Sequence, residues 1–131
     1  MNPRQFTRRL LLPAALLFAL ATAAFLPPAA FGHAIILSST PAANAQVAKG
    51  PIDIVLQYNS LIDIGHSRVS LVDPAGKVTA LAVSKGAAPG ALAAHGSTDS
   101  LGRWIIRWQV LSTDGHITRG DIPFQVIATT P

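Results

Sequence analysis

The sequence predicts an all-β domain, a Greek-key β-sandwich or small barrel of about seven strands. Three observations predict it. Beyond residue 32, apolar residues recur at every second position, which is the period of a strand rather than of a helix. Turn-forming segments rich in Gly, Pro, Asn and Asp separate these stretches at short intervals. About 100 residues remain once the N-terminal segment is set aside, which suffices for one domain around one core.

The N-terminal segment has the layout of a secretory signal peptide. Three arginines precede a mostly apolar run, which is followed by two prolines and a small-residue stretch, Ala29–Gly32. Small residues at the last and third-last positions, Gly32 and Ala30, favour cleavage after Gly32. We therefore predict a signal peptide at 1–32 and one domain at 33–131, with His33 as the first mature residue. The pair Arg8-Arg9 leaves the general and the twin-arginine export routes open.

The predicted strands follow in chain order. A short first strand is expected at 34–37, and a second at 52–58 has apolar residues on one face. Shorter alternating segments at 69–71 and 78–83 flank the turn 73–76. The strand at 103–110 has the clearest alternation and is expected at the centre of the core, and the last strand spans 121–128, where Pro123 predicts an edge position or an irregularity. The residues expected to face the core are Ile52, Ile54, Leu56, Tyr58, Val69, Leu71, Trp104, Ile106, Trp108, Val110, Ile122, Phe124 and Val126.

Some of the chain gives no clear prediction. Residues 85–94 are rich in Gly, Ala and Pro and show no period that separates strand from loop. No segment predicts a helix longer than two turns.

Composition excludes several classes of function. Seven Lys or Arg (ten minus the three in the leader) face six Asp and no Glu after residue 32, so no basic surface for nucleic acid is expected. No second apolar segment approaches the roughly 20 residues of a membrane span, so the mature form is not expected to be embedded in a membrane. With no Cys and Met1 as the sole Met, disulfides, thiolate sites, cysteine catalysis and a thioether site for reduced copper are excluded.

Two features could carry metal chemistry. An N-terminal His33 would present an α-amine and an imidazole from one residue, which together can chelate a metal. The segment Asp114-Gly115-His116 spaces a carboxylate and an imidazole two residues apart, on one side of an extended backbone. Such a tripeptide is most often only a turn, but three nitrogens and one oxygen together suit the tetragonal preference of Cu(II).

Further residues along the mature chain form a recognisable pattern: His33-Ala34, Ser38–Ala42, Pro51, Leu56–Tyr58, Gly102–Trp104, Trp108, Val110–His116, Gly120, Phe124 and Val126. With this pattern the mature chain resembles the copper resistance protein CopC family over nearly all of residues 33–127. The resemblance implies an immunoglobulin-like periplasmic sandwich that binds Cu(II) through His33, Asp114 and His116, and a CopD-like inner-membrane transporter as a partner. We expect a monomer and no enzymatic activity.

This sequence departs from the family pattern in two places. Tyr58-Asn59-Ser60 stands where some members have Phe-Ser-Glu, so an axial contact from a glutamate is not available. Residues 72–80 contain no Met, whereas other members have a Met-rich loop for Cu(I) in this region. We therefore expect a Cu(II)-only protein.

Other functions stay open at this point. A histidine-brace copper monooxygenase would share His33 and a second histidine, a metal-free exported interaction domain would use neither, and the same ligands could hold Zn(II). His66 is expected to be half-buried in packing and His95 to be structural or solvated, while Trp104 and Trp108 are expected in the core.

Overall fold

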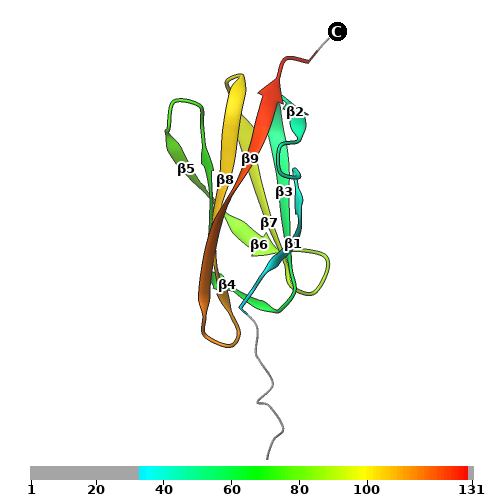
Figure 1. The fold of residues 1–131 in the computed structure, drawn as a ribbon, viewed down its shortest axis with the longest axis vertical. Coiled ribbons are helices and arrows are strands. Elements are labelled where there is room, and N and C mark those ends of the chain that lie inside the picture. Colours follow the sequence, from blue (N-terminus) through cyan, green and yellow to red (C-terminus); the bar gives the residue numbers. More distant parts are fainter. Residues whose placement is uncertain (1–32, 130–131) are drawn as a thin grey trace, which may run out of the picture. The chain divides into compact units, whose positions relative to one another are not determined.

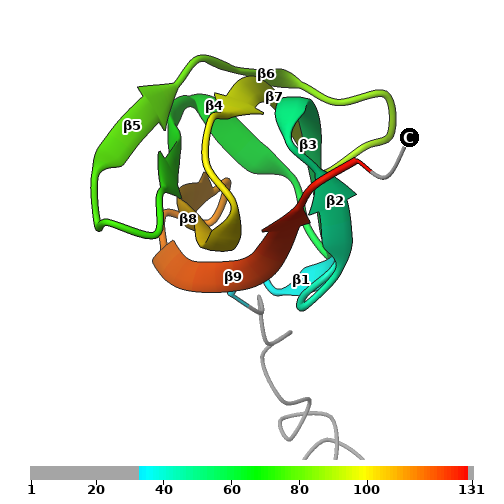
Figure 2. The ribbon, with the colours of Figure 1, turned by 90° about the horizontal axis from the view of Figure 1, so that it is seen from above.

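A computed structural model describes residues 33–129, and the predicted signal peptide lies outside them. The described residues form two sheets packed as a sandwich, without a helix, which confirms the predicted fold class. None of them forms a helical segment of the length and apolarity that crossing a membrane requires. Figures 1 and 2 show the strands in the two layers.

The four-stranded sheet has the order β1-β3-β7-β6, and the five-stranded sheet the order β2-β9-β8-β4-β5. Most neighbours pair antiparallel, while β2 runs parallel to β9. The strands are β1 (Ile36–Thr40), β2 (Gln46–Ala48), β3 (Gly50–Tyr58), β4 (Ile62–Val72), β5 (Val78–Leu81), β6 (Val83–Lys85), β7 (Ala91–Thr98), β8 (Gly102–Ser112) and β9 (Ile117–Ile127).

The core lies between the inner faces of the sheets, where the predicted alternation places it. Ile54 and Leu56 on β3 and Ile106 and Val110 on β8 have no exposed surface. β8 lies between β4 and β9, as its pattern predicts for a central strand. The two tryptophans are also buried, Trp104 at 4% and Trp108 at 9% exposure, so their predicted core role is confirmed.

The structure differs from the predicted strands in several regions. β2 was not predicted, and β4 and β9 begin earlier than expected, at Ile62 and Ile117. The segment 78–83 is not one strand: β5 pairs with β4 in one sheet, whereas β6 pairs with β7 in the other, so the chain changes sheets at Ala82. The segment that gave no prediction contains the start of β7, a long strand between β3 and β6. Its alternation was hidden because, after Leu92, the alternating buried positions hold the small or polar side chains of Ala94 and Thr98.

Pro123 lies inside β9, next to β8 on one side and near β2 on the other. The ladder with β2 begins only at Gln125, and the carbonyl of Pro123 accepts the N–H of Asn44, which precedes β2. The N–H and C=O of one strand residue point to the same side, so the missing N–H of Pro123 faces the β2 side just before pairing begins. The proline therefore removes no ladder hydrogen bond.

Candidate functional site

The turn between β8 and β9 is built by Ser112, Gly115 and His116. The N–H of Ser112 donates to the carbonyl of His116 at 2.9 Å, and the N–H of Gly115 donates to the carbonyl of Ser112 at 2.9 Å. Gly115 has φ of +90°, a conformation that L side chains rarely adopt. The turn therefore needs glycine between Asp114 and His116, and it brings the side chain of Asp114 beside the hydroxyl of Ser112.

Asp114 is held by three contacts inside this turn. Its Oδ1 accepts the N–H of His116 at 3.1 Å and the hydroxyl hydrogen of Ser112, and its Oδ2 lies 3.2 Å from Nδ1 of His116. The Ser112 hydroxyl and the His116 amide lower the pKa of Asp114 to about 2, so the carboxylate is ionised at neutral pH. Asp114 thus shows the features of an ordinary Asp-Gly turn and also presents a charged oxygen next to an imidazole.

His33 lies beside this turn although it is 83 positions away in the sequence (116 minus 33). Its ring centroid lies 4.6 Å from that of His116, with the ring planes at 85°. The next residue, Ala34, is 2% exposed, and its carbonyl accepts the hydroxyl of Thr118 on β9 at 3.1 Å. The fold therefore brings all three predicted ligand residues to the end of the sandwich where β8 turns into β9, at the lower end of Figure 1.

The three side chains adjoin without enclosing a site. Within residues 33–129, no three His or Asp side chains are already arranged so that they could hold a metal ion. The side chain of His116 is 57% exposed, so its ring has room to rotate. The donors present, two imidazoles and a carboxylate, are of the types that bind divalent metal ions.

The sequence did not point to two residues that position this site. Ser112 is 3% exposed, and its hydroxyl reaches both Asp114 and, at 3.0 Å, the carbonyl of His116. Thr118 holds the backbone of Ala34, the residue that follows His33. A serine two residues before an Asp-Gly turn was a possible signal for the first, but the contact of Thr118 depends on the tertiary fold and has no local signal.

The other two histidines pair with carboxylates outside the β8–β9 turn. His66 is not half-buried, and the predicted packing role is wrong: its side chain is 74% exposed and its Nδ1 lies 2.9 Å from Asp63. A register shift in β4 between Asp63 and Arg68 turns this segment outward. His95 is solvated, one of the two roles expected for it, and its Nδ1 lies 2.6 Å from Asp53 on the neighbouring strand. Each histidine thus has one exposed carboxylate as its partner.

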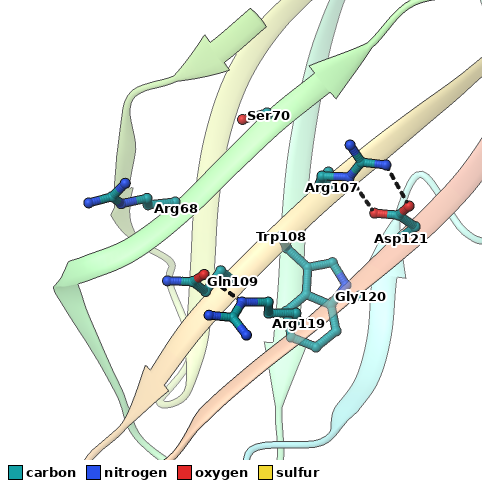
Figure 3. Close-up of a pocket in the computed structure, with 8 residues that line it drawn as sticks. All are labelled: Arg68, Ser70, Arg107, Trp108, Gln109, Arg119, Gly120 and Asp121. Atoms are coloured by element: carbon teal, nitrogen blue, oxygen red, sulfur yellow. Dashed lines mark hydrogen bonds and ion pairs between the residues drawn. The ribbon is translucent and has the colours of Figure 1, made fainter. Parts of the chain in front are cut away.

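A cavity of about 540 Å³ lies elsewhere, on the outer face of the five-stranded sheet (Figure 3). Arg107 donates two hydrogen bonds of 2.9 Å to Asp121, and Nε of Arg119 donates to Gln109 at 2.7 Å. The cavity contains none of the predicted ligands. Its guanidinium groups cannot ligate a metal, because they have no lone pair available when charged.

Comparison with known proteins gives a consistent family. Residues 36–127 match the family model described as the CopC domain. The chain is also 31% identical over 111 residues to Protein YobA of Escherichia coli K12, covering 82% of this chain and 90% of YobA. The same identity and coverage are found for Protein YobA of Shigella flexneri.

Solved structures have the same fold. CopC from Methylosinus trichosporium OB3b superimposes with a TM-score of 0.69 at 26% identity, covering 76% of this chain and 98% of that chain. PcoC, a methionine-rich copper resistance protein from Escherichia coli, superimposes with a TM-score of 0.59 at 24% identity, covering 73% of this chain and all of that one. At that identity, the PcoC match supports the fold alone.

Proposed function

The chain belongs to the CopC family, and from this premise we propose that it is a periplasmic protein that binds one Cu(II) ion. The ligands we assign are the α-amine and imidazole of His33, the carboxylate of Asp114 and the imidazole of His116. Copper is here a cargo that is taken up and released. CopC proteins bind copper and are not enzymes, so we assign no catalytic residue.

The observation that carries this proposal is the contact between the rings of His33 and His116, at 4.6 Å between centroids. Two histidines from distant parts of the chain meet beside a carboxylate that is ionised at neutral pH. If Asp114-Gly115-His116 served only as a turn, it would not require the side chain of His33 beside it. This long-range contact favours a metal site over the purely structural role of the turn.

The donor set favours the oxidised copper ion. The mature chain has no Cys and no Met, so it offers none of the sulfur ligands that Cu(I) prefers. Three nitrogens and one oxygen suit the tetragonal geometry of Cu(II), and Cu(II) is bound more tightly than Zn(II) by such donors in the general affinity order.

We propose that the protein carries or buffers copper in the periplasm and passes it to a CopD-like inner-membrane transporter. Exposed ligands suit such a role, because a partner can reach them: the side chain of His116 is 57% exposed. The copper monooxygenase alternative is disfavoured by Asp114, since its carboxylate would occupy coordination space that oxygen chemistry needs.

The test uses protein exported and processed in a periplasm, then loaded with one equivalent of Cu(II). Intact mass gives the first residue, and the EPR spectrum gives the ligands. We expect a chain that begins at His33 and an axial signal with hyperfine coupling to about three nitrogens. A chain that begins elsewhere, or a spectrum like that of free copper, would overturn the proposal. Loading with Zn(II) in competition with Cu(II) tests the choice of metal.

A further inference from the structure

The N-terminal arm, residues 33–35, lies before β1 and outside its regular pairing with β3. β1 pairs with β3, and the last paired residues at this end are Ile36 and Tyr58, with a register shift between Ile36 and Ser38. β3 ends at Tyr58, so the backbone ladder leaves Ile35 and the residues before it without a strand partner in β3. An exposed arm of this kind loses its order unless other contacts hold it.

Asn59 supplies the missing contacts. Its side-chain Oδ1 accepts the N–H of Ile35 at 2.8 Å, and its backbone N–H donates to the carbonyl of Ile35 at 3.0 Å. The side-chain carbonyl thus takes the place of a backbone carbonyl and extends the pairing by one residue toward His33. Side-chain amides of this type substitute for backbone groups where a ladder ends.

Ile35 is 59% exposed, so packing does not hold it in place. On its other side, Ala34 is buried, and its carbonyl accepts the hydroxyl of Thr118. Ala34 and Ile35 are therefore each held by a different sheet. Asn59, which holds Ile35, follows β3 of one sheet, and Thr118, which holds Ala34, belongs to β9 of the other. Together they determine where His33 emerges, next to His116.

We propose that Asn59 is a positioning residue for copper binding: its side-chain carbonyl holds the N-terminal arm so that the amine and imidazole of His33 reach the ion bound by Asp114 and His116. This inference rests on the proposed function. Asn59 makes no contact with the ion. Its effect on affinity comes from ordering the arm before binding, so that binding does not have to order it.

The test compares processed Asn59→Ala with Gln57→Ala. Gln57 is the matched control, because its side-chain amide also bonds to backbone, at 3.1 Å to Tyr58 and 2.8 Å to Pro89, but it does not touch the arm. We expect Asn59→Ala to weaken Cu(II) binding by about tenfold, the effect of losing one organising hydrogen bond, and Gln57→Ala to leave it unchanged. Chelator competition measures the affinity, and EPR should show a second, less ordered species only in Asn59→Ala.

Three further measurements separate positioning from a general loss of structure. Asn59→Asp keeps the acceptor oxygen, and we expect it to bind copper within about threefold of wild type. Thr118→Val, which removes the other anchor, should weaken binding in the same way. In metal-free protein, hydrogen exchange at the Ile35 amide should accelerate in Asn59→Ala and not in Gln57→Ala.

Equal affinities of Asn59→Ala and Gln57→Ala, or unchanged exchange at Ile35, would overturn the positioning role. So would a loss in Asn59→Asp as large as that in Asn59→Ala. Failure of the proposed function gives a different result: wild type itself would bind no better than protein with a blocked N-terminus, whatever the exchange at Ile35 shows.

Discussion

Ser112 shows how one buried hydroxyl can organise a binding turn. It is the last residue of β8, is 3% exposed, and contacts both the carboxylate of Asp114 and the carbonyl of His116. The carboxylate therefore keeps its charge and its orientation without a metal. Ser112 contributes no ligand, but the turn that presents two of the proposed ligands depends on it.

The two ligands of the turn are expected to contribute unequally. His116→Ala removes one of the three proposed nitrogen ligands and should weaken Cu(II) binding by more than about 100-fold. Mutation of groups that only hydrogen-bond to metal ligands already lowers metal affinity about 10- to 100-fold. Asp114→Ala removes the one oxygen ligand and should cost less, about tenfold. Chelator competition at pH 7 measures both. Equal or reversed losses would contradict the assigned roles.

A pH-dependent contribution to stability is expected from Asp121, far from the proposed ligands. The guanidinium of Arg107, 2.9 Å away, lowers the pKa of Asp121 below its ordinary 3.8. A lowered folded-state pKa gives stability that is present above about pH 4 and is lost as the pH falls through the lowered value. Asp121→Asn should therefore lower the free energy of unfolding slightly at pH 7, and the difference should shrink as the pH falls below about 4. Urea unfolding of metal-free protein across this range measures it, and a difference that does not change with pH would contradict the assignment.

Among the elements, the β8–β9 hairpin and the β4–β5 hairpin allow a controlled comparison. Gly115 has φ of +90° and Gly76 in the β4–β5 turn has φ of +88°, and a Cβ at either position would meet nothing within 4 Å. Alanine at either position should cost about 1–2 kcal/mol of unfolding free energy from backbone strain alone. Thermal unfolding of the metal-free variants measures this cost.

Only Gly115→Ala should also change copper binding, because it moves Asp114 relative to His116. The expected signs are a weaker affinity and altered EPR parameters, with Gly76→Ala identical to wild type. The same EPR change in both variants would show that the hairpin geometry does not control the site.

Elements with a large apolar side chain at each buried position could be predicted from sequence, and the others could not. β3 and β8 have Ile, Leu, Tyr, Trp or Val at every second residue, and both were predicted in place. β7 was missed because Ala, Gly and Thr occupy many of its positions. The break at Ala82 was missed because alternation says which residues are buried and not which sheet buries them.

The candidate site, too, could be predicted only in part. Asp114 and His116 are separated by one residue, so their spacing in the sequence was enough to predict them as a pair. The approach of His33 depends on a tertiary arrangement, and the prediction of it rested on the resemblance to a family. The roles of Asn59 and Thr118 could not be predicted, because each acts through the backbone of residues before β1, Ile35 and Ala34, that are distant in sequence.

At the scale of the whole molecule, the proposed chelate depends on where the chain begins. A Gly-Ser extension before His33 converts the α-amine into an amide and should weaken Cu(II) binding at least tenfold, about the effect of losing one ligand. The fold should not change, because Ala34 and the strands after it keep their contacts. Thermal unfolding without metal should therefore be the same for both forms.

With free Cu(II) at 100 times its Kd, binding to the processed form should add about 2.7 kcal/mol to the free energy of unfolding, and the extended form should gain much less. The gain should also disappear between about pH 7 and pH 5, where protons compete for imidazole. The proposed chelate would be wrong if equal gains were found in the two forms.

The anchoring of Ala34 has a consequence for the lifetime of the protein. His33 is the only proposed ligand that an exopeptidase can remove, and the buried, hydrogen-bonded Ala34 behind it would resist further trimming. A single cleavage would leave a folded protein that no longer binds copper. A bound ion would tie the first residue to the β8–β9 hairpin and block that cleavage, so copper itself would preserve the molecules that carry it.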